Sequence, residues 1–287
     1  MSYKIFVDTG ADLPEERAAA NDIGIIRFLS VFGDTSYVTG TELSNEEFYK
    51  KLAESSEIPT TSQTPYAEFY KILKNASLEY DTVIYFALSS VASGQYNTAC
   101  MIRNEILESD NPNADIRIID TKRFSVFETL AAIRTKELLD SGETVDNAIK
   151  QAMEYMESWE VYILVDTLKY LEKGGRITKT SAIVGTLLDI KPVLTIRNGL
   201  IEPVEKIRGR KRLYKKLVEL IRANPAFDNG SGEFIIVQSN KEYGEEMRAL
   251  LKEEFGIADV KDYVSMGPVI GTHIGPGTLA VLFRLKD

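Results

Sequence analysis

The residues best suited to chemistry lie in one stretch, Pro268–Gly277, which contains the only histidine of the chain, His273. Histidine is the side chain that changes between hydrogen-bond donor and acceptor near neutral pH. Glycines at 271, 275 and 277 let the backbone adopt a positive φ or approach a ligand closely. We therefore expect a glycine-rich turn that presents His273 to a ligand. A core histidine that caps a structural turn is the alternative.

Hydroxyl side chains occupy three further predicted turns. Thr9 follows the apolar run 4–7, Thr61 and Ser62 lie in a segment bracketed by prolines, and Ser93 with Gly94 follows the apolar run 82–88. Hydroxyls and amides at the start of a helix suit a carboxylate or phosphate. Ordinary helix-capping turns contain the same residue types, so a structural role for each is the alternative.

Several motifs of enzymes are absent from the sequence. It contains no G-x-x-x-x-G-K-[ST] loop, no G-x-G-x-x-G after a strand and no H-E-x-x-H. Because there is one histidine, a Ser-His-Asp triad would have to use Ser93 and His273. A self-sufficient hydrolase or acyltransferase built on these two residues is the alternative to a binding site without an activated nucleophile.

Composition sets the class of protein. The chain has 287 residues, 44% hydrophobic and 27% charged, which predicts a soluble protein with one large domain or two moderate ones. Its net charge of −9 argues against general nucleic-acid binding. A lone cysteine, Cys100, leaves no intrachain disulfide and no cysteine-based zinc site. We expect a cytoplasmic protein, because the first residues do not resemble a signal peptide and no stretch reaches membrane-spanning length.

The order of elements predicts an α/β fold. Apolar runs at 4–7, 82–88 and 116–120 are each followed by a helical pattern, which predicts a mainly parallel sheet with helices on both faces. Asn198-Gly199 is a strong hairpin signal and indicates antiparallel pairing. We expect two α/β domains, 1–160 with a parallel sheet and 161–287 with a mixed sheet. Short helices are expected at 166–172 and 183–188.

The segment 206–216 is dense in Lys and Arg, although the chain as a whole is acidic. It includes Arg208, Arg210 and Lys211. A solvated helix face and a docking patch for a phosphate or an acidic partner both fit this pattern.

Taken together, the motifs resemble the DegV family, bacterial fatty-acid-binding proteins that act as lipid-carrying subunits of fatty acid kinase. The resemblance spans the whole length and is carried by seven segments in order: Asp8–Pro14, Thr61–Gln63, Leu88–Ser90 with Ser93–Gly94, Ile119–Asp120, Lys173–Ile177, Ile190–Pro192 and Thr272–Gly277.

The resemblance implies a fold of two α/β domains with the ligand between them, and a long-chain fatty acid as that ligand. It implies no cofactor, no metal and no catalytic residue, a role in phospholipid metabolism, and transient membrane contact, while the net charge already excludes nucleic acid as a partner. A separate kinase subunit would phosphorylate the carboxylate, with Arg176 and the basic segment as docking residues. The acyl chain would enter the apolar interior of the second domain. The implied head-group residues are Thr61, Ser62, Ser93, Gly94, His273 and Gly275.

Three positions depart from the family pattern. Gly10 stands where a hydroxyl residue is usual, Gln95 where Thr is common, and Arg123–Phe127 replaces a run of smaller residues. We expect these positions to bear on chain-length preference and partner identity. Burial of an acyl chain contributes about 0.8 kcal/mol per methylene, so the tail would set affinity and the polar groups would fix orientation.

Overall fold

The structure is a computed structural model that describes residues 2–178, 190–208 and 210–286. The chain forms two compact units. The first comprises Met1–Ser44, Pro59–Met156 and Gly267–Val269; the second comprises Asn45–Ile58, Glu157–Met266 and Ile270–Asp287. The sequence analysis did not predict that segments of the two units would alternate along the chain. The expected boundary at residue 160 falls inside a strand that begins at Trp159 and belongs to the second unit.

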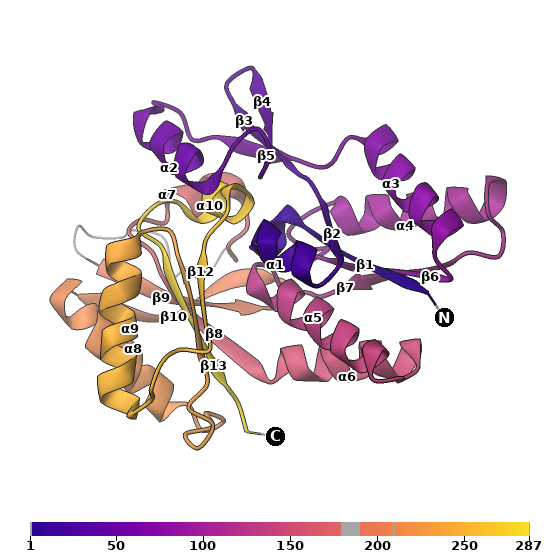
Figure 1. Ribbon diagram of the computed structural model, residues 1–287. Coiled ribbons are helices and arrows are strands. Elements are labelled where there is room, and N and C mark those ends of the chain that lie inside the picture. The colour runs from indigo at the N-terminus through magenta and orange to yellow at the C-terminus, as the bar shows by residue number, and fades with distance from the viewer. Residues whose placement is uncertain (1, 179–189, 209, 287) are drawn as a thin grey trace. The chain divides into compact units, whose positions relative to one another are not determined.

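The main sheet of the first unit has four strands, all parallel (Figure 1). In spatial order they are β2 (Ile23–Ile26), β1 (Tyr3–Asp8), β6 (Thr82–Ala87) and β7 (Asp115–Asp120). Alternate strand residues point to opposite faces, so each face needs its own helices. The helices of this unit are α1 (Glu15–Ala20), α3 (Tyr66–Glu79), α4 (Gln95–Ser109), α5 (Val126–Asp140) and α6 (Val145–Glu157).

One face of this sheet packs against α3 and α4. Phe69 and Leu73 of α3 and Ile102 of α4 are fully buried there against Val83 and Tyr85 of β6. The helix α5 contacts β1 and β6 and covers the other face (Figure 1). The predicted parallel sheet with helices on both faces is therefore confirmed.

A small antiparallel sheet also belongs to the first unit. Its spatial order is β4 (Thr35–Val38), β3 (Leu29–Phe32) and β5 (Thr60–Ser62). The chain breaks at Arg27-Phe28 between β2 and β3, and the turn predicted around Thr61 and Ser62 contributes the strand β5. Three-residue strands carry too little pattern to be recognised from sequence.

The second unit contains a six-stranded mixed sheet, in which only β11 and β12 pair in parallel. Its spatial order is β10 (Leu200–Arg208), β9 (Ile190–Arg197), β8 (Trp159–Leu164), β13 (Leu279–Arg284), β11 (Phe234–Gln238) and β12 (Asp262–Ser265). The predicted hairpin joins β9 and β10, with φ values of +49° at Asn198 and +81° at Gly199. The expected mixed sheet is confirmed.

Helices α8 (Arg210–Ala223) and α9 (Lys241–Phe255) pack on one face of this sheet through a large apolar cluster. Shorter helices complete the unit: α2 (Asn45–Glu54), α7 (Lys169–Gly174) and most of α10 (Pro268–Ile274). The short helix expected at 166–172 begins later, at Lys169, and the helix expected at 183–188 lies outside the described residues.

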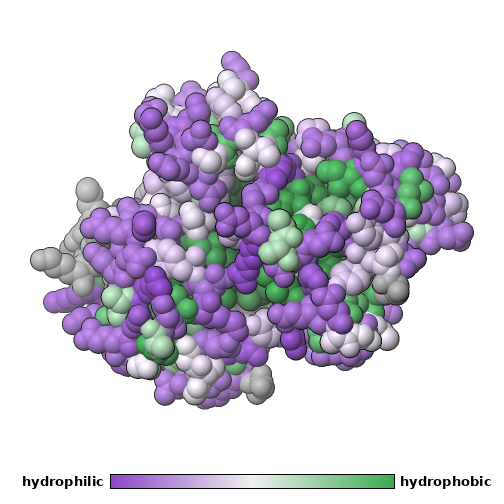
Figure 2. Space-filling model, in the orientation of Figure 1, coloured by the Kyte–Doolittle hydropathy of each residue, from purple (hydrophilic) through white to green (hydrophobic). Residues whose placement is uncertain are grey.

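Hydrophilic side chains cover most of the face shown in Figure 2, with hydrophobic patches among them. The large hydrophobic side chains that are exposed in the described chain are Tyr66, Leu78, Val91, Met101 and Val204. Tyr66 and Leu78 belong to α3, Met101 to α4 and Val204 to β10, and single apolar residues of this kind are usual on a protein surface. In the described part of the chain, no helix combines the length and apolar character needed to cross a membrane.

Candidate functional site

The C-terminal end of β1 carries the buried carboxylate of Asp8, where parallel sheets place ligand groups. Its oxygens accept hydrogen bonds from the Gly10 N–H at 2.8 Å, the Tyr85 hydroxyl at 2.7 Å and the Leu88 N–H at 3.3 Å. Burial raises the pKa of Asp8 to about 6, although these hydrogen bonds oppose the rise. Asp8 therefore connects the turn that follows β1 with the C-terminal end of β6 in the first unit.

Two more buried carboxyl groups lie near Asp8. Asp12 accepts hydrogen bonds from the Ser125 hydroxyl at 2.5 Å and from the Gly267 N–H at 2.7 Å, and burial raises its pKa to about 7. Burial, followed by the charges of Asp8 and Asp12, raises the pKa of Glu128 well above its usual value. Three carboxyl groups thus share a dry region in which protonated forms are favoured. Sequence reasoning missed Glu128, because a Glu in the first turn of a helix is ordinarily exposed.

The turn between β6 and α4 positions Ser93. The Ser89 N–H donates to the Arg123 carbonyl at 2.8 Å, and the Ser93 N–H donates to the Ser89 carbonyl at 3.0 Å. The Ser93 hydroxyl oxygen accepts from the Gln95 N–H at 3.2 Å. A hydroxyl that accepts at its oxygen can still donate its hydrogen, so Ser93 is placed to bind an anion near the positive end of α4.

The strand β5 presents Thr61 and Ser62 to opposite sides. It pairs with β3 in the register Leu29↔Ser62, Ser30↔Thr61 and Val31↔Thr60. Directly paired residues share a face and successive residues alternate, so Thr61 lies on the face of Ser30 and Ser62 on the face of Leu29. Thr61 is half-buried, whereas Ser62 is exposed. The two hydroxyls expected to act together therefore point in different directions.

The residues after β5 join it to the start of α4. The Thr98 hydroxyl donates to Gln63 Oε1 at 2.7 Å, and Gln95 Nε2 donates to the Thr64 hydroxyl at 2.9 Å. A Cβ added to Gly94 would lie 2.7 Å from Gln63 Nε2, so the Gln63 side chain packs closely against Gly94. The structure thus brings the segments of Thr61–Ser62 and Ser93–Gly94 together in the first unit. Gln95, a departure from the family pattern, is part of that link.

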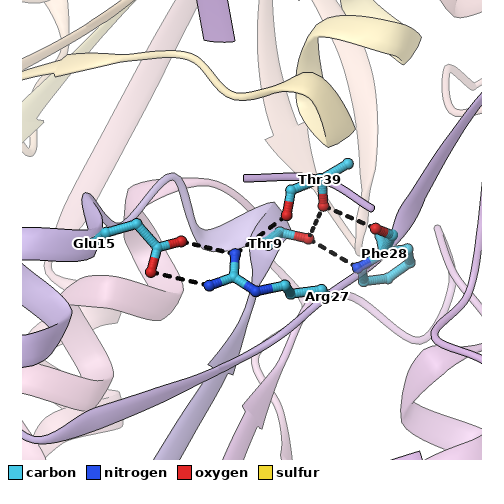
Figure 3. A network of polar contacts seen from close by, with 5 residues as sticks. All are labelled: Thr9, Glu15, Arg27, Phe28 and Thr39. Carbon is cyan, nitrogen blue, oxygen red and sulfur yellow. Dashed lines mark hydrogen bonds and ion pairs between the residues drawn. The ribbon is translucent and has the colours of Figure 1, made fainter. Parts of the chain in front are cut away.

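Thr9 has a structural role in the first unit (Figure 3). Its hydroxyl accepts from the Phe28 N–H at 3.0 Å and lies 2.7 Å from the Thr39 hydroxyl. Arg27 binds Glu15 through two hydrogen bonds of 2.7 and 3.0 Å and also donates to the Thr39 carbonyl at 3.2 Å. This network holds the segment before β3, and β3 in turn carries β5.

The second unit positions His273 in the last turn of α10. The turn expected around it is a short helix, because Pro268 suits a first helical position and Gly275 supplies the left-handed residue that ends it, with φ +87°. A Cβ at Gly275 would also lie 2.4 Å from the Tyr170 ring. The imidazole packs against Gly174, where an added Cβ would be 2.7 Å from Nδ1.

The imidazole of His273 is neutral at physiological pH. Burial, and next the positive charge of Arg176, lower its pKa to about 4. The Arg176 guanidinium donates to the carbonyl of Gly174 in the same turn. A general base in a serine hydrolase needs a pKa near the working pH and is commonly oriented by a carboxylate. The cation beside His273 has the opposite effect, which argues against the hydrolase alternative.

The remaining predicted docking residues are only partly described. Arg208 ends β10, and Arg210 and Lys211 begin α8, but their side chains lie outside the described part of the structure. Within residues 2–178, 190–208 and 210–286, no group of three or more His, Cys, Asp or Glu side chains is placed to hold a metal ion.

The first unit has a parallel sheet with hydroxyl groups at its carboxyl end, and the second unit has a mixed sheet and a neutral histidine. This combination defines a class of two-unit α/β proteins. Comparison with known proteins identifies it further: residues 2–286 match the family model described as an uncharacterised protein, DegV family. The chain belongs to the DegV family.

Individual relatives match over nearly their whole length. A DegV domain-containing protein of Clostridium perfringens is 32% identical, covering 98% of this chain and 97% of the relative. The crystal structure of DegV from Bacillus subtilis, described as a fatty acid binding protein, superposes with a TM-score of 0.85 at 29% identity over all of both chains. A stearic acid-binding protein from Eubacterium ventriosum superposes with a TM-score of 0.86 at 26% identity over 98% of each chain.

Proposed function

We propose that this protein binds one long-chain fatty acid and holds its carboxylate with neutral hydrogen-bond donors. The observation that carries the proposal is the full-length similarity to DegV of Bacillus subtilis, a fatty acid binding protein. The local geometry supports it, because Ser93 accepts from the Gln95 N–H and retains a hydrogen to donate. The proposed head-group residues are those expected from the sequence: Thr61, Ser62, Ser93, Gly94, His273 and Gly275.

A neutral site is sufficient for such a ligand. Each buried methylene contributes about 0.8 kcal/mol, so an acyl chain of ~15 methylenes supplies roughly 12 kcal/mol before entropic costs. His273 stays uncharged with a pKa of about 4, and it can donate from one ring nitrogen. The tail then sets affinity, and the donors set orientation.

We propose the apolar interior of the second unit as the location of the acyl chain. Strands β8, β13 and β11 are buried on both faces, and every residue from Trp159 to Leu164, from Leu279 to Phe283 and from Phe234 to Gln238 is buried. A sheet whose buried side chains are mostly apolar offers mainly hydrocarbon contacts, which suits an alkyl chain. Glu160 of β8 is a polar exception, and it forms an ion pair with the partly exposed Arg197.

The finer part of the proposal is a partner. The bound carboxylate would be presented to a separate kinase subunit, whose nucleotide would transfer a phosphoryl group to a carboxylate oxygen and yield an acyl phosphate. Arg176, half-buried beside His273, would dock this partner together with Arg208, Arg210 and Lys211. Arginine suits this role because its planar guanidinium binds phosphate and carboxylate groups through two hydrogen bonds.

The first experiment is mass spectrometry of the protein purified from a bacterial host, under native conditions and then after solvent extraction. We expect about one fatty acid per chain. Protein that is empty and also fails to take up added fatty acid would overturn the proposal. In that case, labelling of Ser93 by a fluorophosphonate would support the hydrolase alternative.

Mutants then test the head-group residues. Ser93→Ala and His273→Ala should each weaken retention of the fatty acid while the far-UV circular dichroism stays unchanged. The matched control is Ser77→Ala, which removes another buried hydroxyl of the first unit whose hydrogen bond, 2.8 Å to the Lys74 carbonyl, is local to α3. Equal retention in all three variants would contradict the assignment of the head group.

The kinase role needs its own measurement. With ATP and a fatty acid kinase subunit from the same organism, the loaded protein should give an acyl phosphate that hydroxylamine traps as a hydroxamate. Arg176→Glu should slow this reaction without loss of bound lipid. A variant with normal kinetics would remove Arg176 from the docking surface.

A further inference from the structure

A buried hydroxyl in the small sheet of the first unit has no hydrogen-bond partner among the described residues. Ser30, in the middle of β3, is 0% exposed, and its Oγ makes no hydrogen bond with any described residue. Buried polar groups are almost always paired, because leaving one unpaired destabilises the folded state. The Ser30 hydroxyl is therefore available to donate a hydrogen bond to a ligand.

The register of the sheet places Ser30 beside a head-group residue. Ser30 pairs directly with Thr61 in the antiparallel ladder of β3 and β5. The Cβ atoms of such a pair lie about 4.5–5.5 Å apart on one face of the sheet. Ser62 is on the other face and is exposed. The hydroxyl that accompanies Thr61 is therefore that of Ser30.

We propose that Ser30 is a further head-group residue, which donates a hydrogen bond to a carboxylate oxygen of the bound fatty acid alongside Thr61. This inference rests on the proposed function. A carboxylate has two oxygens and accepts several hydrogen bonds, so it can bind two adjacent hydroxyls at once. A ligand with a neutral head group, such as an ester, would gain less from Ser30, because hydrogen bonds to a charged acceptor are stronger than those to a neutral one.

The sequence could not single out Ser30. It lies in the apolar run Leu29–Phe32, and only the pairing of β3 with β5 brings it next to Thr61. The pairing also changes which hydroxyl accompanies Thr61. Thr61 and Ser62 are adjacent in sequence but lie on opposite faces of β5, so Ser30 is the hydroxyl that shares a face with Thr61.

The test measures binding of stearate, and of methyl stearate as a probe without a carboxylate, to delipidated protein by calorimetry. Ser30→Ala should weaken stearate binding about tenfold, the effect of one hydrogen bond to a charged group. It should change methyl stearate binding much less. Ser62→Ala should cost less stearate affinity than Ser30→Ala. The double variant Ser30→Ala/Thr61→Val should lose less than the product of the two single losses, because both residues contact one group.

The matched control is Thr135→Val. Thr135 is also 0% exposed with an unpartnered hydroxyl, but it lies in α5, away from β3 and β5 in the topology of the unit. Its loss should leave stearate affinity unchanged. Both single variants should melt no lower than the parent, since each removes an unpaired buried hydroxyl. If Ser30→Ala fails to fold, Ser30→Cys keeps the volume with a weaker donor and should bind with intermediate affinity.

The outcomes are separable. Wild-type protein that binds no stearate overturns the proposed function and this inference with it. Wild-type binding together with unchanged binding by Ser30→Ala overturns the inference alone, and a larger loss in Ser62→Ala would show that the ligand contacts the opposite face of β5.

Discussion

The two units hold titratable groups whose pKa values shift in opposite directions. The first buries the carboxyl groups of Asp8, Asp12 and Glu128, and each has a raised pKa. The second holds the imidazole of His273, whose pKa is lowered. Burial favours the neutral form in both cases. Each unit therefore offers hydrogen-bonding groups with little charge, which fits a ligand whose affinity comes from its hydrocarbon part.

The largest expected effects come from the two cores. Phe69→Ala in the first unit and Phe234→Ala in the second should each lower the free energy of unfolding by about 3–5 kcal/mol, because both side chains are fully buried. The ring of Phe69 meets that of Tyr85 edge-on, with centroids 5.7 Å apart, and the ring centroids of Phe234 and Phe255 are 4.7 Å apart. Urea unfolding measures both changes.

The only tryptophan, Trp159, reports on the second unit alone. If the units unfold independently, Phe234→Ala shifts the transition of Trp159 fluorescence and Phe69→Ala shifts only part of the circular dichroism. Equal shifts of the fluorescence transition in both variants would show that the chain unfolds as one cooperative structure.

The opposite pKa shifts predict opposite dependences on pH. Asp12 titrates at 3.8 when unfolded and at about 7 when folded, so its contribution is complete below pH 3.8 and is lost as pH rises toward 7. His273 titrates at 6.5 when unfolded and at about 4 when folded, so its contribution is present above pH 6.5 and is lost as pH falls toward 4.

Variants separate the two contributions. Relative to the parent, Asp12→Asn should gain on the order of 2–4 kcal/mol of stability between pH 4 and pH 8, at about 1.4 kcal/mol per pKa unit. His273→Asn should gain a similar amount from pH 7 to pH 4. Urea unfolding across this range tests both, and parallel pH profiles for parent and variants would contradict the shifts.

Glycines with positive φ allow a sharper comparison within the chain. Gly275→Ala should cost about 1–2 kcal/mol for the left-handed backbone and more for the contact with the Tyr170 ring. Gly142→Ala is the matched control, because its φ is +94° but no atom lies within 4 Å of an added Cβ. Thermal unfolding should rank Gly275→Ala as the more damaging change. Equal costs would mean that Tyr170 moves aside without loss.

The smallest effects are expected in the network of Figure 3. Thr9→Val removes the acceptor of the Phe28 N–H and should cost about 1–3 kcal/mol. Glu15→Ala breaks an ion pair with Arg27 whose acidic side chain is 55% exposed, and it should cost less than about 1 kcal/mol. A reversal of this order would mean that the ion pair, and not Thr9, holds the start of β3.

The sequence was sufficient to predict the elements that show a clear apolar run or a clear turn signal. Buried strands such as Thr82–Ala87, and the hairpin at Asn198-Gly199, were predictable because apolar runs and turn residues report directly on local structure. It was insufficient where pairing decides the outcome. The face that Thr61 shares with Ser30 depends on the register of two short strands, and the burial of Glu128 depends on the packing of α5.

The hydrogen bond from the Gly267 N–H to Asp12 joins residues 255 positions apart in the chain. During synthesis at roughly 5–20 residues per second, Asp12 would therefore wait on the order of 10–50 seconds before its partner emerges from the ribosome. Through that interval Asp12 lacks one of its two hydrogen-bond donors, with only the Ser125 hydroxyl available. The first unit, although it contains most of the N-terminal half of the chain, can be completed only after most of the second has been made, so its final assembly step is late in translation.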